Sequence, residues 1–178
     1  MQNLSQYSKI YKHNKSILFR FIWYAINIIV FKSYMFPFSN IKIILLKLFG
    51  AKVGKGIIIK PCVNIKYPWM LVIGDNVWIG EDVWFDNLGL ITIGSNVCIS
   101  QGAYLLTGNH NYKEEKFDLI VKNIVLDDGV WICAKAIVCP GITMNKNSIL
   151  TAGSVLSLNT EEGCIYKGNP AQYYKKRY

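Results

Sequence analysis

A period of six residues in the C-terminal half of the sequence strongly limits the folds open to this chain. Between residues 124 and 158, a large apolar side chain recurs at every sixth position, and a small or β-branched residue follows it four positions later. The large residues are Leu126, Ile132, Val138, Met144, Leu150 and Leu156, and the small ones are Val130, Ala136, Ile142, Ser148 and Ser154. A helix would need spacings of three and four, and a half-buried strand would need strict alternation. The period of six instead predicts a parallel β-helix, in which each hexad forms one short strand and one corner.

Weaker hexads extend this pattern toward the N-terminus. The large positions there are Ile73, Ile79, Phe85, Ile93, Ile99 and Leu105, and a fainter set consists of Val53, Ile59 and Ile65. Two extra residues at 88–90 shift the phase between these runs. An antiparallel sandwich would need polar and apolar residues alternating along strands of about 5–6 residues. We therefore expect a mainly β protein in which three hexads make one triangular coil.

Glycine, asparagine and aspartate mark the expected corners. Gly54, Gly74, Gly80 and Gly94 each follow an apolar residue, where the backbone must bend. The pairs Asp75-Asn76, Ser95-Asn96 and Asp127-Asp128 also suit tight turns, because Asn and Asp tolerate the left-handed conformation.

Three runs of residues resemble a known family. IGDNVWIGEDVWFDNLG, ITIGSNVCISQGAYLLTGNHNY and GNPA, within about Val53 to Arg177, are similar to the hexapeptide-repeat acyltransferases. The resemblance is closest to the acetyltransferases of colanic-acid and other exopolysaccharide clusters, and more distant to galactoside, maltose and antibiotic O-acetyltransferases. It implies a left-handed β-helix, an exception to the usual right-handed crossover.

We expect one domain in three parts. Residues 1–50 form an N-terminal leader and helical segment, and residues 51–160 form the left-handed β-helix catalytic domain with a loop excursion at 107–123. Residues 161–178 form a C-terminal tail, which could be a short terminal helix.

The apolar stretch Ser16–Phe31 is too short to span a bilayer and contains Arg20. It also lacks the cleavage site of a signal peptide. One interpretation is a helix packed on the β-helix or on a neighbouring subunit. The other is peripheral contact with the inner membrane, with Lys9, Lys12, Lys15 and Arg20 near lipid phosphates. Ser39–Phe49 is predicted to be a second helix, capped by Ser39 or Asn40 and ended by Gly50.

Composition narrows the class of partner and the compartment. The formal net charge is +9, but the basic residues look dispersed and no nucleic-acid motif is present, so coenzyme A phosphates or an anionic membrane fit better than nucleic acid. Five cysteines without a C-x-x-C pair, and only two histidines, argue against a metal site. Free thiols predict a reducing, cytoplasmic location. Within the cytoplasm, the protein could also contact the inner face of the membrane peripherally.

Acyl transfer to a hydroxyl needs a base, and a neutral histidine suits that task near pH 7. His13 lies in a polar leader, whereas His110 opens the excursion after a rigid hexad. TGNHNY matches the family pattern TG-x-H-x-Y, and the resemblance implies that His110 is the general base. Its orienting partner stays open between Glu81, Asp82, Asp86 and a backbone carbonyl.

The resemblance also implies two binding regions. Asp86 and Asn87 would lie in the acceptor site, with Asn87 as the expected hydrogen-bond donor, although the pair could be a simple turn before Gly89. Trp84 and Tyr112 could stack on a sugar or cover the core. Acetyl-CoA, the expected co-substrate, would lie between two β-helices of a homotrimer. The positions matching its contacts are Trp131, Ala134, Ala152, Gly153, Ser157 and Lys175. Cys133 replaces the family's usual glycine, and Ser157-Leu158 replaces a Thr-Lys pair.

These observations predict an acetyl-CoA-dependent O-acetyltransferase acting on a sugar hydroxyl of an exopolysaccharide, capsule or O-antigen precursor. N-acetylation of an amino sugar, or acetylation of serine or an antibiotic, is the alternative among enzymes. A non-catalytic β-helix scaffold is the alternative outside them. A γ-type carbonic anhydrase is excluded because it needs three histidines for zinc.

Overall fold

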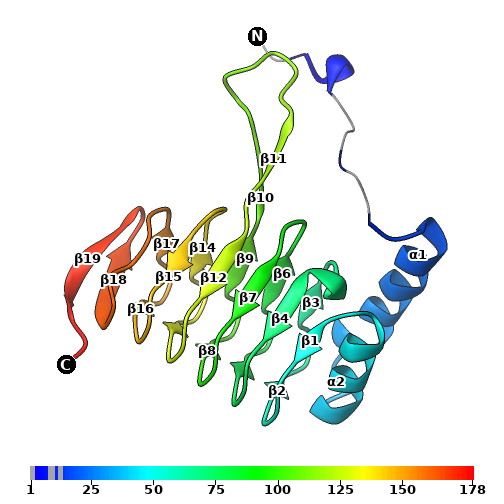
Figure 1. Ribbon diagram of the computed structural model, residues 1–178, viewed down its shortest axis with the longest axis horizontal. Coiled ribbons are helices and arrows are strands. Elements are labelled where there is room, and N and C mark those ends of the chain that lie inside the picture. The colour runs from blue at the N-terminus through cyan, green and yellow to red at the C-terminus, as the bar shows by residue number, and fades with distance from the viewer. Residues whose placement is uncertain (1–2, 8–10, 12–13) are drawn as a thin grey trace.

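The hexads form strands of two or three residues, and the chain winds through three of them in each coil of a parallel β-helix (Figure 1). The structure is a computed structural model that describes residues 3–7, 11 and 14–178. His13, Lys9 and Lys12 lie outside the described residues.

Three sheets form the sides of the prism. Sheet A contains β1 (Lys52–Val53), β4 (Leu71–Ile73), β7 (Ile91–Ile93), β12 (Ile124–Leu126) and β15 (Thr143–Met144). Sheet B contains β2 (Ile58–Ile59), β5 (Trp78–Ile79), β8 (Cys98–Ile99), β13 (Trp131–Ile132), β16 (Ile149–Leu150), β18 (Cys164–Gly168) and β19 (Ala171–Lys176). Sheet C contains β3 (Asn64–Ile65), β6 (Trp84–Asp86), β9 (Tyr104–Leu106), β14 (Ile137–Val138) and β17 (Val155–Leu156). We call the corners between them AB, BC and CA.

The strand register shows that the coils differ in length. Lys52 pairs with Val72 and Val72 with Thr92, so the first coils contain 20 residues, whereas Val125 pairs with Thr143 in an 18-residue coil. The two extra residues of each long coil lie at the CA corner, where the short helix η3 (Pro68–Met70) also forms. The phase shift noted at 88–90 is therefore one of two.

The large hexad residues point into the prism, as predicted. Ile59, Ile79, Phe85, Leu105 and Leu126 are completely buried. Since each buried aliphatic or aromatic side chain contributes about 1.5–3 kcal/mol, this column of side chains is the main source of stability. Small residues such as Ala136 and Ser148 are buried with them at the corners.

The corner glycines have a different function from the one predicted. Gly74 and Gly94 do not have positive φ. They lie where successive coils touch: a Cβ atom on Gly94 would be 2.8 Å from the Asp128 nitrogen. The left-handed conformation occurs instead at Asn76 (φ 55°) and Asn96 (φ 58°), as predicted, and at Gly129 (φ 71°) rather than Asp128.

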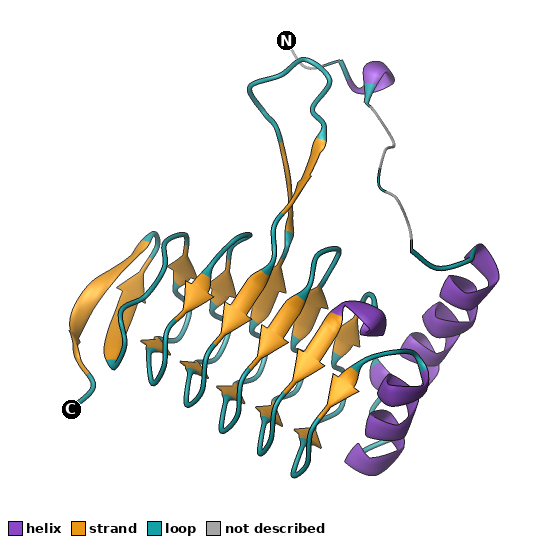
Figure 2. Cartoon of the chain, in the orientation of Figure 1, coloured by secondary structure: helices purple, strands orange, loops and turns teal. Residues whose placement is uncertain are grey.

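Two helices lie across the first coil (Figure 2). A short helix, η1 (Leu4–Gln6), precedes them. Ser16 caps α1 (Ile17–Ile26), which continues as the π-helical turn η2 (Asn27–Phe31). Trp23 Nε1 donates to the Ile65 carbonyl at 2.9 Å, which fixes α1 on the first coil. No helix within residues 14–178 or the shorter described stretches has the length and apolarity needed to cross a membrane.

The second helix, α2 (Ser39–Leu48), is not capped as predicted. Its N-cap residue is Phe38, with no side-chain cap, because Ser39 Oγ instead accepts from the Ile59 nitrogen at 3.0 Å. Gly50, with φ of +91°, follows the helix end as expected. Lys42 of α2 is completely buried, and its Nζ donates to the Lys60 carbonyl at 2.8 Å.

The C-terminal tail does not form the short helix that was one possibility for it. The tail instead forms the antiparallel pair β18 and β19 at the end of sheet B, where Tyr166 lies opposite Tyr173 (Figure 2). Without the tail, β16 would be the edge strand of sheet B and would leave backbone groups unpaired; β18 pairs with it in parallel, and β19 then pairs with β18 in the antiparallel direction. Pairing the tail as strands satisfies those groups, which a helix could not do.

Candidate active site

The excursion leaves the prism at the CA corner as a hairpin of β10 (Gly108–His110) and β11 (Leu119–Val121) (Figure 1). Its base is anchored by Thr107, which is completely buried. Thr107 Oγ1 donates to the Asp86 carbonyl at 2.9 Å and accepts from the Gly89 nitrogen at 2.9 Å. The hairpin is therefore attached to the coil that carries Asp86.

His110 is the last residue of β10, and its ring is held by the other arm of the excursion. Nδ1 lies 2.9 Å from the Phe117 carbonyl oxygen, and the imidazole stacks in parallel on the Phe117 ring, 4.4 Å between centroids. Since a carbonyl only accepts hydrogen bonds, Nδ1 carries the hydrogen, and Nε2 of the neutral ring keeps its lone pair. The orienting partner left open by the sequence is thus a backbone carbonyl, not Glu81, Asp82 or Asp86.

Two further aspects of this histidine were not visible in the sequence. Phe117 adopts φ of +52°, unusual for a bulky residue, and this turn directs its carbonyl at the imidazole. The Tyr7 ring, from the N-terminal leader, lies 5.7 Å from the His110 ring, and the Asn3 nitrogen donates to the Glu115 carbonyl. The leader therefore reaches the tip of the excursion.

Asp86 lies at the end of β6 and is paired. Lys66 Nζ is 2.7 Å from Asp86 Oδ1, and the Tyr104 hydroxyl is 3.5 Å from Oδ2. Burial, and next the negative charge of Asp86, raise the pKa of the Tyr104 hydroxyl. Lys66 was not among the predicted site residues, but the 20-residue coil indicates it, because a residue 20 positions before Asp86 lies directly beside it.

Asn87 does not fit its expected role as a donor to the acceptor. It is completely buried, and Oδ1 accepts from the Tyr67 nitrogen at 3.0 Å. Its Nδ2 donates to the Tyr67 carbonyl at 2.6 Å and to the Met70 carbonyl at 3.2 Å. Both amide hydrogens are thus used to hold the long CA corner, so the simple structural interpretation is the better one for this residue.

Trp84 and Tyr112 do not cover the core. Trp84 stacks on Tyr104 with 4.7 Å between ring centroids on the outer face of sheet C, and Tyr112 is exposed on the excursion. Trp84 also lines a groove of about 500 Å³ between α1 and sheet C. Arg20, Lys66 and Tyr67 line the same groove, which combines aromatic surface with positive charge.

The small residues predicted to contact the coenzyme gather at the BC corner. Ala134 and Gly153 lie on successive coils, and the Gly153 nitrogen donates to the Ala134 carbonyl at 2.9 Å. Ala152 is exposed, and a Cβ atom on Gly153 would meet nothing within 4 Å. This open backbone surface could admit an extended ligand.

Trp131 and a second groove adjoin the same corner. The Trp131 side chain is half exposed on sheet B and donates from Nε1 to Ser100 Oγ at 2.9 Å. A groove of about 350 Å³ continues along the earlier coils. Its lining residues are Lys60, Trp78, Gly80, Glu81, Cys98, Ile99, Ser100 and Gln101. Ser100 and Gln101 were not predicted, although their hexad register places them one coil below Ala134.

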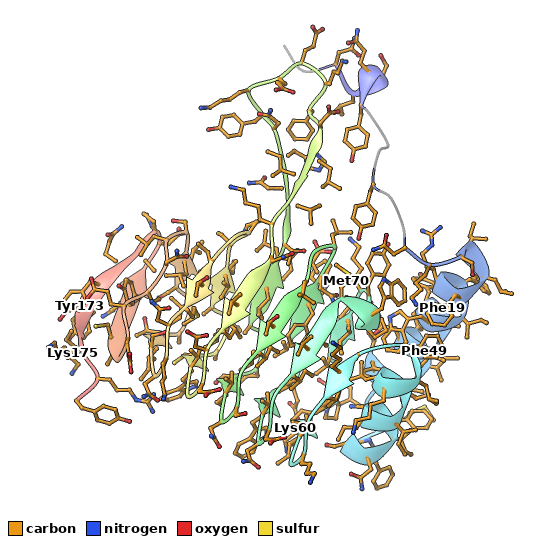
Figure 3. All side chains as sticks on the ribbon, viewed as in Figure 1. Phe19, Phe49, Lys60, Met70, Tyr173 and Lys175 are labelled. Carbon is orange, nitrogen blue, oxygen red and sulfur yellow. The ribbon has the colours of Figure 1, made fainter. Side chains whose placement is uncertain are left out.

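The remaining predicted coenzyme residues are elsewhere. Ser157 follows β17 at the CA corner, and Lys175 lies in β19. Figure 3 shows Lys175 and Tyr173 at the end of the prism opposite Phe19 and Phe49. Arg177, which follows β19, donates to the Gly129 and Asn147 carbonyls. The residues predicted to bind the coenzyme therefore lie in separate places on one chain.

Sheet C separates the BC corner from the base of the excursion. Gly153 and Ser157 are four positions apart in the sequence, and an extended chain of that length spans about 13 Å. The excursion that carries His110 therefore leaves the prism at one corner, whereas Trp131, Ala134 and Ala152 lie at another. A single chain does not bring its predicted base and its predicted coenzyme surface together at one corner.

The cysteines carry no nucleophilic site. All five are free, and burial raises the pKa of the Cys133 and Cys139 thiols, so both favour the protonated form. The two follow β13 and β14, on adjacent faces of the prism.

The parallel β-helix, with its histidine on an excursion, defines a class of acyltransferase-like proteins, and comparisons specify the family. No family model matches the sequence. The chain is 35% identical over 179 residues to the "Putative colanic acid biosynthesis acetyltransferase WcaF" of Escherichia coli (strain K12), covering 99% of this chain and 98% of the relative.

Solved structures support the same fold. A hexapeptide-repeat-containing acetyltransferase of Vibrio cholerae O1 biovar eltor, complexed with acetyl coenzyme A, superimposes with a TM-score of 0.80 at 21% identity, covering 90% of this chain and 88% of that one. A galactoside acetyltransferase in complex with coenzyme A gives a TM-score of 0.79 at 18% identity, covering 93% and 86%.

The chain belongs to the hexapeptide-repeat acetyltransferases, and within them to the colanic acid biosynthesis group represented by WcaF. It is therefore an enzyme, an acetyltransferase, and the non-catalytic scaffold alternative is set aside.

Proposed function

We propose that the protein transfers an acetyl group from acetyl-CoA to a sugar hydroxyl of an exopolysaccharide, capsule or O-antigen precursor. The observation that carries this proposal is the hydrogen bond from His110 Nδ1 to the Phe117 carbonyl, which leaves Nε2 as a base. The identity to WcaF supports the polysaccharide assignment, and the galactoside acetyltransferase supports a sugar acceptor.

His110 acts on the acceptor in this mechanism. Its Nε2 takes the proton of the hydroxyl as the hydroxyl oxygen forms a bond to the acetyl carbon. Acetyl-CoA, when bound, supplies the acetyl group as a thioester whose sulfur is the leaving group. The Phe117 carbonyl stabilises the imidazolium formed in this step, because Nδ1–H donates more strongly when the ring is charged. The imidazolium then returns its proton to the departing thiolate.

The coenzyme surface fits the open BC corner. The backbone at Gly153 is unobstructed, and Trp131 offers an aromatic face beside it. Ala134, Ala152 and Gly153 would let the pantetheine arm approach the stacked backbone closely, and Ser157 and Lys175 would meet it farther along. The acceptor would contact Asp86, Trp84 and Tyr112.

A homotrimer would join the two halves of this site. His110 and the BC corner belong to different edges of one prism, so the excursion of one subunit would reach the BC corner of the next. Closed three-fold symmetry allows each subunit to supply one of each. Such a site explains why the hairpin extends away from its own prism (Figure 1). The proposed setting is the cytoplasm, where acetyl-CoA is made.

Calorimetry and transfer assays test this function. Acetyl-CoA binding would be measured for the wild type and for His110→Ala, together with acetyl transfer to monosaccharides, nucleotide sugars and amino sugars. We expect equal coenzyme affinity in both proteins and a fall in transfer to hydroxyls of about 10²–10⁴-fold in the variant. His13→Ala, which removes the only other histidine, is the matched control and should keep full activity.

Each alternative has its own result. Acetylation of amino groups but not hydroxyls would replace the O-acetyl assignment by N-acetylation. Full activity in His110→Ala would contradict the assignment of His110 as the general base. Absence of acetyl-CoA binding in both proteins would contradict the proposal as a whole.

A further inference from the structure

The two N-terminal helices, which we call the helical cap (α1, η2, the link 32–38 and α2), leave much apolar surface uncovered. The inner side of α1 packs on the first coil through Trp23 and Phe31, which are buried. The outer side carries further large apolar residues that are exposed: Ile17, Leu18, Phe21, Ile22, Tyr24, Ile28 and Ile29. A helix that is apolar on both sides normally has partners on both sides.

The rest of the helical cap also exposes apolar side chains. Ile41, Ile44 and Leu48 are spaced three and four residues apart, so they form one exposed stripe on α2. The link adds Tyr34, Met35 and Phe38, all exposed. Isolated apolar residues on a surface need no explanation, but a cluster of this size marks an interaction site.

Charge is distributed unevenly along the chain, contrary to the dispersed arrangement expected from the sequence. Residues 1–74 contain eleven of the 20 Lys and Arg residues and none of the 11 Asp and Glu residues, because the first acid is Asp75. The exposed cations of the described part of this segment include Lys15, Lys32, Lys47 and Lys66. The helical cap therefore carries positive charge and contains no acid, although Lys66 of the first coil pairs with Asp86 of the second.

The cations lie beside the apolar surface. Arg20, Lys32 and Lys66 line the groove between α1 and sheet C, together with Phe21 and Ile28 of the exposed side. The buried Arg20 Nε has no hydrogen-bond partner among the described residues. Positive charge next to exposed aromatic and aliphatic side chains is the pattern of a surface that binds the headgroup region of a membrane.

We propose that the helical cap docks on an anionic lipid bilayer. The outer side of α1, with Phe21 and Tyr24, enters the boundary between headgroups and acyl chains, and the exposed lysines meet lipid phosphates. A second copy of the chain is a poorer partner, because two such surfaces would bring together two helical caps that contain Lys and Arg residues but no acid. This docking is independent of the acetyl-transfer chemistry.

Docking would also orient the site. The groove beside α1 includes Lys66 and Trp84, and Lys66 contacts Asp86 at the base of the excursion. An acceptor still attached to a membrane lipid would thus approach along a surface that already binds lipid phosphate. This consequence rests on the proposed function, whereas the docking itself does not.

Vesicle co-sedimentation of the full chain tests the docking. The vesicles would be phosphatidylcholine alone, or phosphatidylcholine with about 30% phosphatidylglycerol, for which we expect at least about tenfold tighter binding. Raising the salt from about 0.1 M to about 0.5 M should remove most of that difference, because the Debye length shortens. The double variant Leu18→Ser/Phe21→Ser should lose at least about tenfold in affinity for the anionic vesicles.

Matched controls lie outside the helical cap. Tyr174→Ser/Tyr178→Ser removes two exposed aromatic residues outside the helical cap and should bind vesicles as the wild type does. Lys15→Glu/Lys47→Glu should weaken binding, whereas Lys113→Glu/Lys146→Glu, with the same change in net charge, should not.

Two results would overturn the proposal. One is equal binding to neutral and anionic vesicles, or no binding to either. The other is a smaller subunit number for Leu18→Ser/Phe21→Ser by light scattering, which would assign the surface to another copy of the chain. Acetyl-CoA affinity, measured on the same samples, separates failure of docking from failure of the proposed function.

Discussion

Lys42 occupies an unusual environment for a single charged residue. It is completely buried, and its Nζ donates to the carbonyls of Ile59 and Lys60 in the first coil. An ammonium group can satisfy backbone acceptors that the missing preceding coil leaves free. The same burial lowers the pKa of Lys42 from 10.5. Its charged form is therefore less favourable in the folded protein than in the unfolded chain.

This burial predicts a pH dependence of stability. Between the lowered pKa and 10.5, the unfolded chain binds more protons at Lys42 than the folded protein does. The free energy of unfolding contributed by this residue should therefore be lowest below the folded pKa and should rise as the pH approaches 10.5. Urea unfolding at about pH 7 and about pH 9.5 should show a gain in stability for the wild type relative to Lys42→Met.

The control is on the same helix. Lys47→Met replaces an exposed lysine of α2 and should follow the wild-type pH dependence. If Lys42→Met and the wild type change in parallel with pH, the burial of the Lys42 charge does not affect folding as described.

The proposed active-site geometry depends on the excursion, which Thr107 anchors. Thr107→Val keeps the shape but removes both hydrogen bonds of the hydroxyl and leaves the buried Gly89 nitrogen without a partner. A buried unsatisfied group costs about 1–3 kcal/mol, so we expect that loss in the free energy of unfolding. We also expect slower acetyl transfer with unchanged acetyl-CoA affinity, because the hairpin that carries His110 loses its anchor.

Thr92→Val provides the comparison, since Thr92 lies on the outer face of β7 and not at the base of the excursion. A reduction in transfer of the same size in both variants would show that the Thr107 hydrogen bonds do not position His110.

The elements differ in how well the sequence predicts them. Hexads identify strands and core positions such as Ile79 and Phe85, because one large side chain in six must fill the prism. The C-terminal strands were missed because their pairing depends on the open edge of sheet B and not on a local pattern. Motif resemblance indicates His110 as the candidate base, but Phe117 holds its ring through a backbone turn seven residues later. No side-chain pattern indicates that turn.

At the scale of the whole molecule, the proposed base and the proposed coenzyme surface lie at different corners of one prism. Within a coil, register could have predicted this: His110 follows sheet C, whereas Ala134 and Ala152 follow sheet B. The burial of Asn87, by contrast, could not be predicted from the register. It follows from the extra residues of the CA corner. From this separation we infer that the active site is shared between subunits, which is the central claim.

Mixed oligomers test this claim most directly. His110→Ala and Ala152→Trp, which fills the open BC corner, should each be nearly inactive alone. Co-expressed with separate tags and purified as mixed oligomers, they should recover about a third of wild-type transfer, because one of the three interfaces in every mixed trimer has both contributed surfaces intact. Activity no higher than that of the separate variants would contradict a site built from the excursion of one subunit and the BC corner of the next.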